Sequence, residues 1–192
     1  MLESHYLARP FPGGFTWTLA SRLGQMLHDL EGRFGPRDPS YTILGIEFKA
    51  GGPQLWFPGN RRHMVIQLGA DCQDDDARAL FQLSHEAVHL LNPRAQPAAS
   101  VLEEGLATWY SQDYTRRVFG TPFAIGDHKY EAAERLVRPI AEETPATIRT
   151  LRSTYGGLTG PRADQVAECI TTIGQSKCVE LTTLFSTWAH GA

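Results

Sequence analysis

The chain has 192 residues, of which 42% are hydrophobic and 20% are charged, and 18 lysines and arginines nearly balance 21 aspartates and glutamates. A chain of this length is expected to form one domain, residues 1–192, that folds without disulfide bonds. The formal net charge of -3 lacks the basic excess that a nucleic-acid-binding protein needs. The apolar content is too high for a disordered chain. We therefore expect a folded domain without a nucleic-acid partner.

The sequence favours a soluble protein of a reducing compartment. No stretch approaches the ~20 consecutive apolar residues of a membrane span, and the first five residues lack the basic and then apolar order of a secretory signal. The cysteines, Cys72, Cys169 and Cys178, form neither a metal-binding CxxC pair nor an even disulfide framework. We expect reduced thiols, a cytoplasmic location and no membrane partner. A bridge between Cys169 and Cys178 is the alternative if the protein is secreted.

The N-terminal part is expected to form one helix and then three short strands. Apolar residues recur at three- and four-residue steps over residues 16–34, which predicts an amphipathic helix that ends before Gly35-Pro36. Period-two alternation and short apolar runs predict strands at 41–49, 54–57 and 63–68. Turn-forming residues at 58–62 favour an antiparallel hairpin, and so a small antiparallel or mixed sheet.

The remainder is expected to be mostly helical. The apolar period predicts a helix from the aspartates at 71–76 to about Asn92, just before Pro93, with Leu80, Leu83, Ala87 and Leu91 on its buried face. Ser100 and Glu103 have the spacing of a capping box, which predicts that a second helix starts there. Further helices are expected at 127–141, 145–155, 161–173 and 176–189. Strands followed by helices predict an α+β domain.

The helix expected at about 76–92 contains His85-Glu86-Ala87-Val88-His89, an H-E-x-x-H motif. Two histidines four residues apart project from one helical face and can bind one zinc ion. Glu86 lies about 100° round the helix from His85, where it can reach a water molecule on that ion. The alternative is a surface helix with two ordinary histidines and a solvated glutamate.

A catalytic zinc site has three protein ligands and one open position, so a third donor is required. His89 is followed by Leu-Leu-Asn-Pro-Arg, which excludes the extended motif that ends in a third histidine. The best donors are in the next helix, in the run Leu102-Glu103-Glu104-Gly105-Leu106-Ala107. The two motifs together, over residues 80–111, resemble those of the gluzincin-type zinc metallopeptidases, in which a second helix supplies a glutamate ligand.

The resemblance implies a zincin-like domain in which His85, His89 and Glu104 bind Zn2+ and Glu86 is the general base. Helix geometry also favours Glu104 over Glu103, because neighbouring side chains point about 100° apart and Glu103 is expected to cap Ser100. The alternative for the two glutamates is a solvated helix start favoured by the helix dipole. The missing side chain of Gly105 is expected to let this helix approach the ion and the first helix closely.

Other residues of the site are assigned by type. The donor to the oxyanion in this enzyme class is commonly a Tyr or His after the second helix, and we expect Tyr155, with His128, Tyr130 and Tyr114 as alternatives. Thr108 or Ser111 is expected to accept a hydrogen bond from a metal-binding histidine. The basic pair Arg149 and Arg152 is expected to be solvated.

The predicted function is that of a zinc metallopeptidase acting on a peptide or protein substrate. Zinc would lower the pKa of its bound water from ~15.7 towards ~7, and Glu86 would take the proton and deliver it to the leaving amine. The strand at 63–68 would hold the substrate as an added strand, unless it is a purely structural central strand. Two alternatives are a non-catalytic zinc-stabilised binding or regulatory domain and a narrow-specificity intracellular protease acting on one protein. The oligomeric state is left open.

Overall fold

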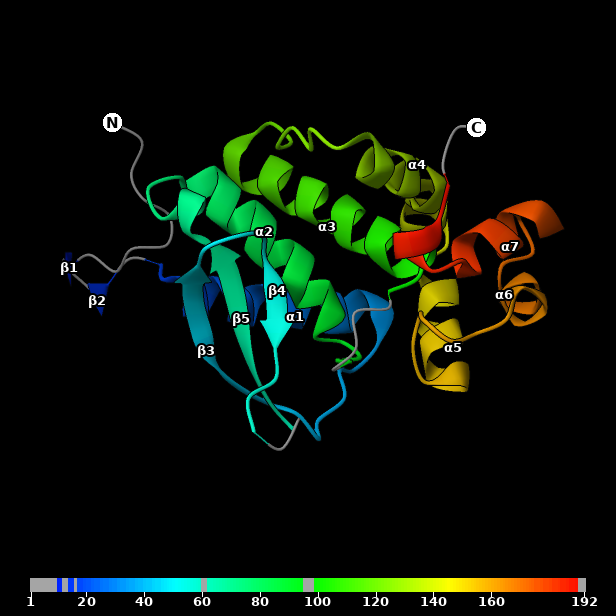
Figure 1. The fold of residues 1–192 in the computed structure, drawn as a ribbon, viewed down its shortest axis with the longest axis horizontal. Helices are drawn as coiled ribbons and strands as arrows, with labels where there is room; N and C mark the ends of the chain where they lie inside the picture. Colours follow the sequence, from blue (N-terminus) through cyan, green and yellow to red (C-terminus); the bar gives the residue numbers. More distant parts are fainter. Residues whose placement is uncertain (1–9, 12–13, 16, 60–61, 95–98, 190–192) are drawn as a thin grey trace.

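The structure, a computed structural model, describes residues 10–11, 14–15, 17–59, 62–94 and 99–189. In this part of the chain a small mixed sheet precedes a mostly helical remainder, so the α+β class expected from the sequence is correct (Figure 1). The N-terminal strands β1 (Pro10–Phe11) and β2 (Gly14–Phe15) form a separate antiparallel pair. No helix of the described residues combines the length and the apolar character that a bilayer crossing requires.

The main sheet has the strand order β3-β5-β4, so its central strand is β5 (His63–Gly69). The edge strand β3 (Thr42–Lys49) pairs with β5 in parallel, whereas β4 (Gln54–Trp56) pairs with it antiparallel. Both edges of β5 are paired, and the alternating residues Met64, Ile66 and Leu68 bury one face of the strand completely. The expectation that 63–68 holds a substrate as an added strand is therefore wrong. Within the described residues, β4 pairs on one side only.

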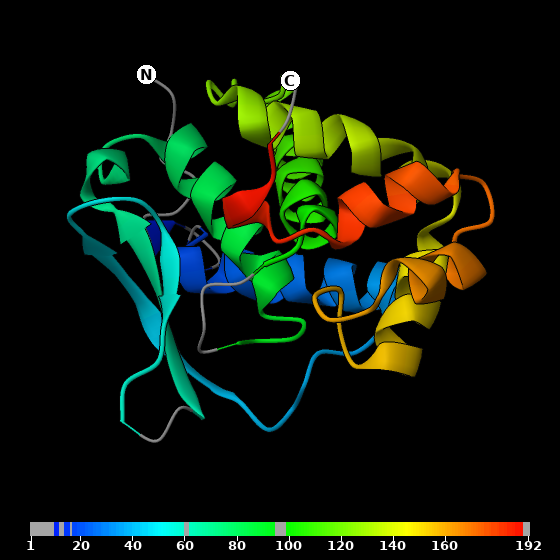
Figure 2. The same ribbon diagram turned by 45° about the vertical axis from the view of Figure 1, so that its right-hand side comes forward.

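Three helices surround the centre of the molecule, α1 (Leu19–Phe34), α2 (Asp76–His89) and α3 (Val101–Phe119). A short 3-10 turn, η1 (Ala70–Cys72), links β5 to α2. Figure 2 shows the sheet on one side of α2, and α2 contacts β5 as well as α3. Side-chain caps explain the starts of these helices, because Thr18, Asp75 and Ser100 each accept a hydrogen bond from a backbone N–H of the first turn.

The C-terminal part contains α4 (His128–Glu143), α5 (Pro145–Tyr155), α6 (Ala163–Cys169) and α7 (Gln175–Thr182), followed by the 3-10 turn η2 (Phe185–Thr187). The helices expected at 161–173 and 176–189 are too long. After α7 the chain pairs with the start of α3, where Val101 N donates to Thr183 O at 2.9 Å and Phe185 N donates to Ala99 O at 2.9 Å. These bonds give partners to backbone N–H and C=O groups outside the helical hydrogen-bond pattern. They hold the segment around η2 near α2 and α3 (Figure 2).

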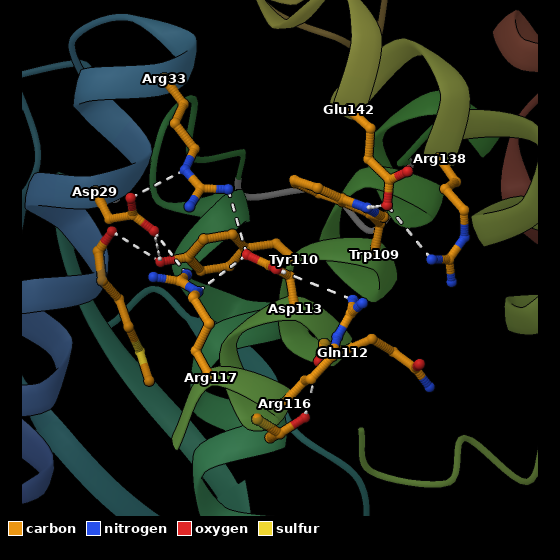
Figure 3. A network of polar contacts seen from close by, with 12 residues as sticks. Asp29, Arg33, Trp109, Tyr110, Gln112, Asp113, Arg116, Arg117, Arg138 and Glu142 are labelled. Carbon is orange, nitrogen blue, oxygen red and sulfur yellow. Dashed lines mark hydrogen bonds and ion pairs between the residues drawn. The ribbon is translucent and has the colours of Figure 1, made fainter. Parts of the chain in front are cut away.

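A network of polar contacts joins α1 to α3 (Figure 3). The Tyr110 hydroxyl, fully buried, donates to Asp29 Oδ2 at 3.1 Å and to Met26 O at 3.3 Å. Arg117 of α3 donates to the same Asp29 oxygen at 2.8 Å. Burial raises the pKa of Tyr110 well above its usual range, so the phenol stays protonated and keeps its donor role.

The side chain of Arg152, on α5, is buried rather than solvated. It donates to the ends of α1 and α2, at Phe34 O, Gly35 O (2.8 Å), Pro36 O (2.9 Å), Leu91 O (3.0 Å) and Asn92 Oδ1 (2.7 Å). Burial lowers the pKa of Arg152 to about 10, which still leaves it charged near neutrality. The final carbonyls of a helix have no partner within the helix, and one guanidinium supplies donors for two such ends. None of the three described cysteines, Cys72, Cys169 and Cys178, forms a disulfide bond.

Gly105 allows a close contact with α4, whereas a close approach to the ion and the first helix was expected. A Cβ atom at this position would lie 2.5 Å from Ala133 O and 2.6 Å from Val137 Cγ2, both on α4. The glycine therefore allows α3 to pack closely against α4, not against α2 or an ion.

We expect Gly105→Ala to destabilise the fold by about 1–3 kcal/mol, because the added methyl group has no space between α3 and α4. Gly24→Ala is the matched control, since a Cβ there, within α1, meets nothing within 4 Å. It should be neutral or stabilise by about 0.5–1 kcal/mol through backbone entropy. Urea unfolding of the three proteins measures both effects, and equal stability of Gly105→Ala and wild type would contradict the packing argument.

Candidate metal centre

The H-E-x-x-H motif lies in the last two turns of α2, opposite the first turn of α3. His85 Nε2 lies 3.1 Å from Glu104 Oε2, and His89 Nε2 lies 3.8 Å from Glu104 Oε1. One donor atom from each of these three residues falls within 4.8 Å of the other two. The structure thus brings together the three residues expected to bind a metal, with both imidazoles presented from one face of α2.

The electrostatics of the cluster favour a positive charge. Burial alone would lower the pKa of His89, but Glu104 and Glu103 outweigh it and raise the pKa to about 10. Burial acts to raise the pKa of Glu104, yet His89 and His85 hold it below its usual value. Glu104 is therefore ionised near neutrality and available as a ligand. Two imidazoles and one carboxylate are a donor set that zinc takes in catalytic sites, so the residues present fit that ion.

Glu86 adjoins the cluster and is only 4% exposed. Burial raises the pKa of its carboxyl group, against the opposing effect of His89 and His85. A carboxylate in this setting accepts a proton more readily than a solvated one, which is the property a general base requires.

The cluster lies in the wall of a cavity of about 820 Å3. The motif residues His85, Glu86 and His89 line it together with the two glutamates of α3. The remaining lining comes from β4 with its flanks and from separate segments of the C-terminal half and the region between α2 and α3. These residues are Gly52 to Phe57, Arg94, Ala99, Tyr130, Phe185 and Ser186. A buried carboxylate and three candidate metal-binding side chains thus line one cavity together with residues of β4.

The structure does not bring Tyr155 to this cavity. Tyr155 ends α5, its hydroxyl donates to Glu168 Oε2 at 3.2 Å, and it is not among the described residues that line the cavity. Tyr130, the second residue after the start of α4, lines the cavity, and its ring centroid lies 5.8 Å from that of His85. The sequence could not rank these tyrosines, because their distance from α2 depends on how α4 and α5 pack.

The other two aromatic alternatives lie elsewhere. His128 is exposed and pairs with Glu131 at 3.2 Å, and Tyr114 is buried in the part of α3 near α1. Of the described candidates for an oxyanion donor, Tyr130 is the one that contacts a candidate metal ligand, His85.

Glu103 has a role that the sequence did not predict. Its backbone N–H donates to Ser100 Oγ at 3.2 Å, as expected for a capped helix, but its carboxylate Oε1 lies 2.9 Å from His89 Nδ1. Thr108 and Ser111, expected to bond a metal-binding histidine, donate to carbonyls of their own helix at 2.8 and 2.7 Å. Glu103 and Glu104 point apart, as helical neighbours must, and contact the two different nitrogens of the His89 ring.

Comparison of the chain with protein-family models, with curated proteins and with solved structures finds no match. The geometry of the site is therefore the basis for inferring its chemistry. That geometry is a convergent His, His and Glu set with a buried carboxylate beside it and a cavity in front of it.

We expect zinc to bind more tightly as the pH rises from 6 to 9, by up to about tenfold per pH unit. The raised pKa of His89, about 10, means that zinc must displace a proton throughout this range, and that competition weakens as the pH rises. Chelator competition at several pH values measures the effect, and calorimetry in two buffers counts the proton released. His128→Ala, at an exposed position outside the cavity, is the control and should behave as wild type. A pH-independent Kd without proton release would contradict this account.

Proposed function

We propose that the protein is a zinc-dependent metallopeptidase of zincin-like fold, with His85, His89 and Glu104 as ligands and Glu86 as general base. The observation that carries the proposal is the convergence of these four side chains, from two helices, on one cavity. Closed structural zinc sites take four protein donors, whereas the cluster found among the described residues contains three, which favours a catalytic over a purely structural ion.

A zinc ion bound at these donors would supply the Lewis acidity that polarises a carbonyl group and lowers the pKa of water from ~15.7 towards ~7. Glu86 takes the proton of the attacking water on its carboxylate. Because burial raises its pKa, Glu86 holds that proton and then gives it to the nitrogen of the leaving amine. One side chain thus acts as base and then as acid, and the peptide bond is cleaved with the addition of one water molecule.

Tyr130 is proposed to donate a hydrogen bond to the substrate oxygen as negative charge develops on it. Burial, with the nearby Glu104, Asp127 and Glu86, raises the pKa of its phenol, so the hydroxyl keeps its proton at neutral pH. Packing against His85 on one side and Phe185 on the other, at a centroid distance of 4.6 Å from the latter, fixes the ring.

The substrate is proposed to lie along β4 rather than along β5. Residues of β4 and its flanks, from Gly52 to Phe57, line the cavity, and the strand pairs with β5 on one side only within the described residues. An extended peptide can add to such an edge through backbone hydrogen bonds, which are largely independent of the peptide's sequence. The 46% exposed side chain of Trp56 provides an apolar contact beside it.

Glu86→Gln is expected to lower kcat on a mixed peptide library by about 100- to 10,000-fold, because the amide cannot accept the proton. Metal analysis of the same protein should still find zinc, since Glu86 is not a ligand. Glu104→Ala is the matched control and should lose zinc and hydrolysis together. Unchanged hydrolysis by Glu86→Gln with zinc bound would contradict the enzyme assignment and favour a non-catalytic zinc domain.

Tyr130→Phe is expected to lower kcat by about 100- to 1,000-fold with little change in KM, because the hydroxyl acts mainly on the developing charge. The phenylalanine ring keeps the packing against His85 and Phe185. Tyr155→Phe removes the same hydroxyl outside the cavity and should leave kcat unchanged. If the two variants have equal kcat, Tyr130 is not the oxyanion donor.

A further inference from the structure

The loop between α5 and α6 reaches the start of α3 through Thr159. The Thr159 hydroxyl accepts a hydrogen bond from Ser100 N at 2.7 Å and donates to Glu103 Oε2 at 2.6 Å. A threonine hydroxyl carries one proton, and the backbone N–H of Ser100 can only donate. The direction of the bond to Glu103 is thereby fixed, from the hydroxyl to the carboxylate.

The Glu103 carboxylate connects the Thr159 hydroxyl to His89. One carboxylate oxygen accepts from Thr159, and the other, Oε1, lies 2.9 Å from His89 Nδ1. An ionised carboxylate only accepts, so the proton of this bond belongs to His89 Nδ1. The other ring nitrogen, Nε2, is then the one left to face Glu104, whose Oε1 lies 3.8 Å away. Such a bond to the far nitrogen fixes the tautomer and the orientation of a metal-binding histidine.

The loop that carries Thr159 is held from both sides. Ser100 Oγ donates to Leu158 O at 3.0 Å, and Arg94 donates to Thr159 O. Gly160, which follows Thr159, has a φ of 122°, a conformation that favours glycine. Ser100, Glu103 and Thr159 are all buried, so water competes little for their hydrogen bonds.

We infer that Thr159, acting through Glu103, is a positioning residue that presents His89 Nε2 to the metal. This inference rests on the proposed zinc site but concerns a residue 55 positions after the last ligand, on an element that supplies no ligand. Changes to groups that orient a metal-binding histidine typically cost 10- to 100-fold in metal affinity. A residue that merely caps α3 would change stability and leave the zinc affinity as it is.

The experiment compares Thr159→Val with Thr159→Ser. Valine has the shape of threonine without the hydroxyl, and serine restores the hydroxyl. We expect the Kd for Zn2+, measured by chelator competition, to rise by about 10- to 100-fold in Thr159→Val and to return to within a few-fold of wild type in Thr159→Ser. Thr115→Val is the matched control, because Thr115 is a buried threonine of α3 that donates to Ser111 O at 2.8 Å. It should lose stability without a change in Kd.

A second measurement needs no variant. Nitrogen-15 NMR of histidine-labelled, zinc-bound wild type shows which nitrogen of His89 carries the proton, and we expect Nδ1. A proton on Nε2, or an unchanged Kd in Thr159→Val, would overturn the inference while the zinc site stands. If wild type binds no zinc, the proposed function falls as well, so the two failures are distinguishable.

Discussion

The interaction on which the rest of the site depends is the burial of two carboxylates, Glu103 and Glu104, against the histidines of α2. An unpaired charge in such a place costs several kcal/mol, so α3 can begin there only if the carboxylates are compensated. Glu104 meets both imidazoles, while Glu103 meets His89 and Thr159. These contacts fix how the end of α2 faces the start of α3. The edge of β4 and the first turn of α4 complete the cavity in front of them.

Local signals in the sequence predicted much of this arrangement. The helix periods, the aspartates at 71–76, the Ser100 cap and the spacing of His85 and His89 each act within a few residues, and the structure contains the helices that they predict. Strand order depends on distant segments, and it was predicted less well. The turn residues at 58–62 correctly indicated an antiparallel pair of β4 and β5, but nothing local showed that β3 runs parallel to β5 and places it at the centre.

Two of the side chains that were assigned wrongly, Glu103 and Arg152, have partners on other helices. Glu103 was expected to bond its own helix start but reaches His89, and Arg152 was expected in solvent but bonds the ends of two other helices. Arginine side chains are mostly exposed in proteins. A glutamate three residues after a serine at a helix start usually bonds the backbone of that serine. The sequence interpretation followed these general tendencies. The backbone carbonyls at and just after the ends of α1 and α2 have no partner within their helix, and Arg152 donates to them. Those carbonyls lie 61 to 118 residues before Arg152 in the sequence, so only folding brings them to its guanidinium.

The same hydrogen bonds bear on how the proposed zinc site would accept a cation. Without a metal, His89 is protonated, because the carboxylates around it raise its pKa to about 10. The Nδ1 proton is held by Glu103, whereas the Nε2 proton faces Glu104, which is itself a proposed ligand. A zinc ion in the place of the Nε2 proton would add one positive charge next to the Glu104 carboxylate and would leave the Nδ1 bond to Glu103 intact. The pairing that stabilises the α2–α3 contact would thus also orient His89 for the proposed ion, and the competing proton would weaken zinc binding at lower pH.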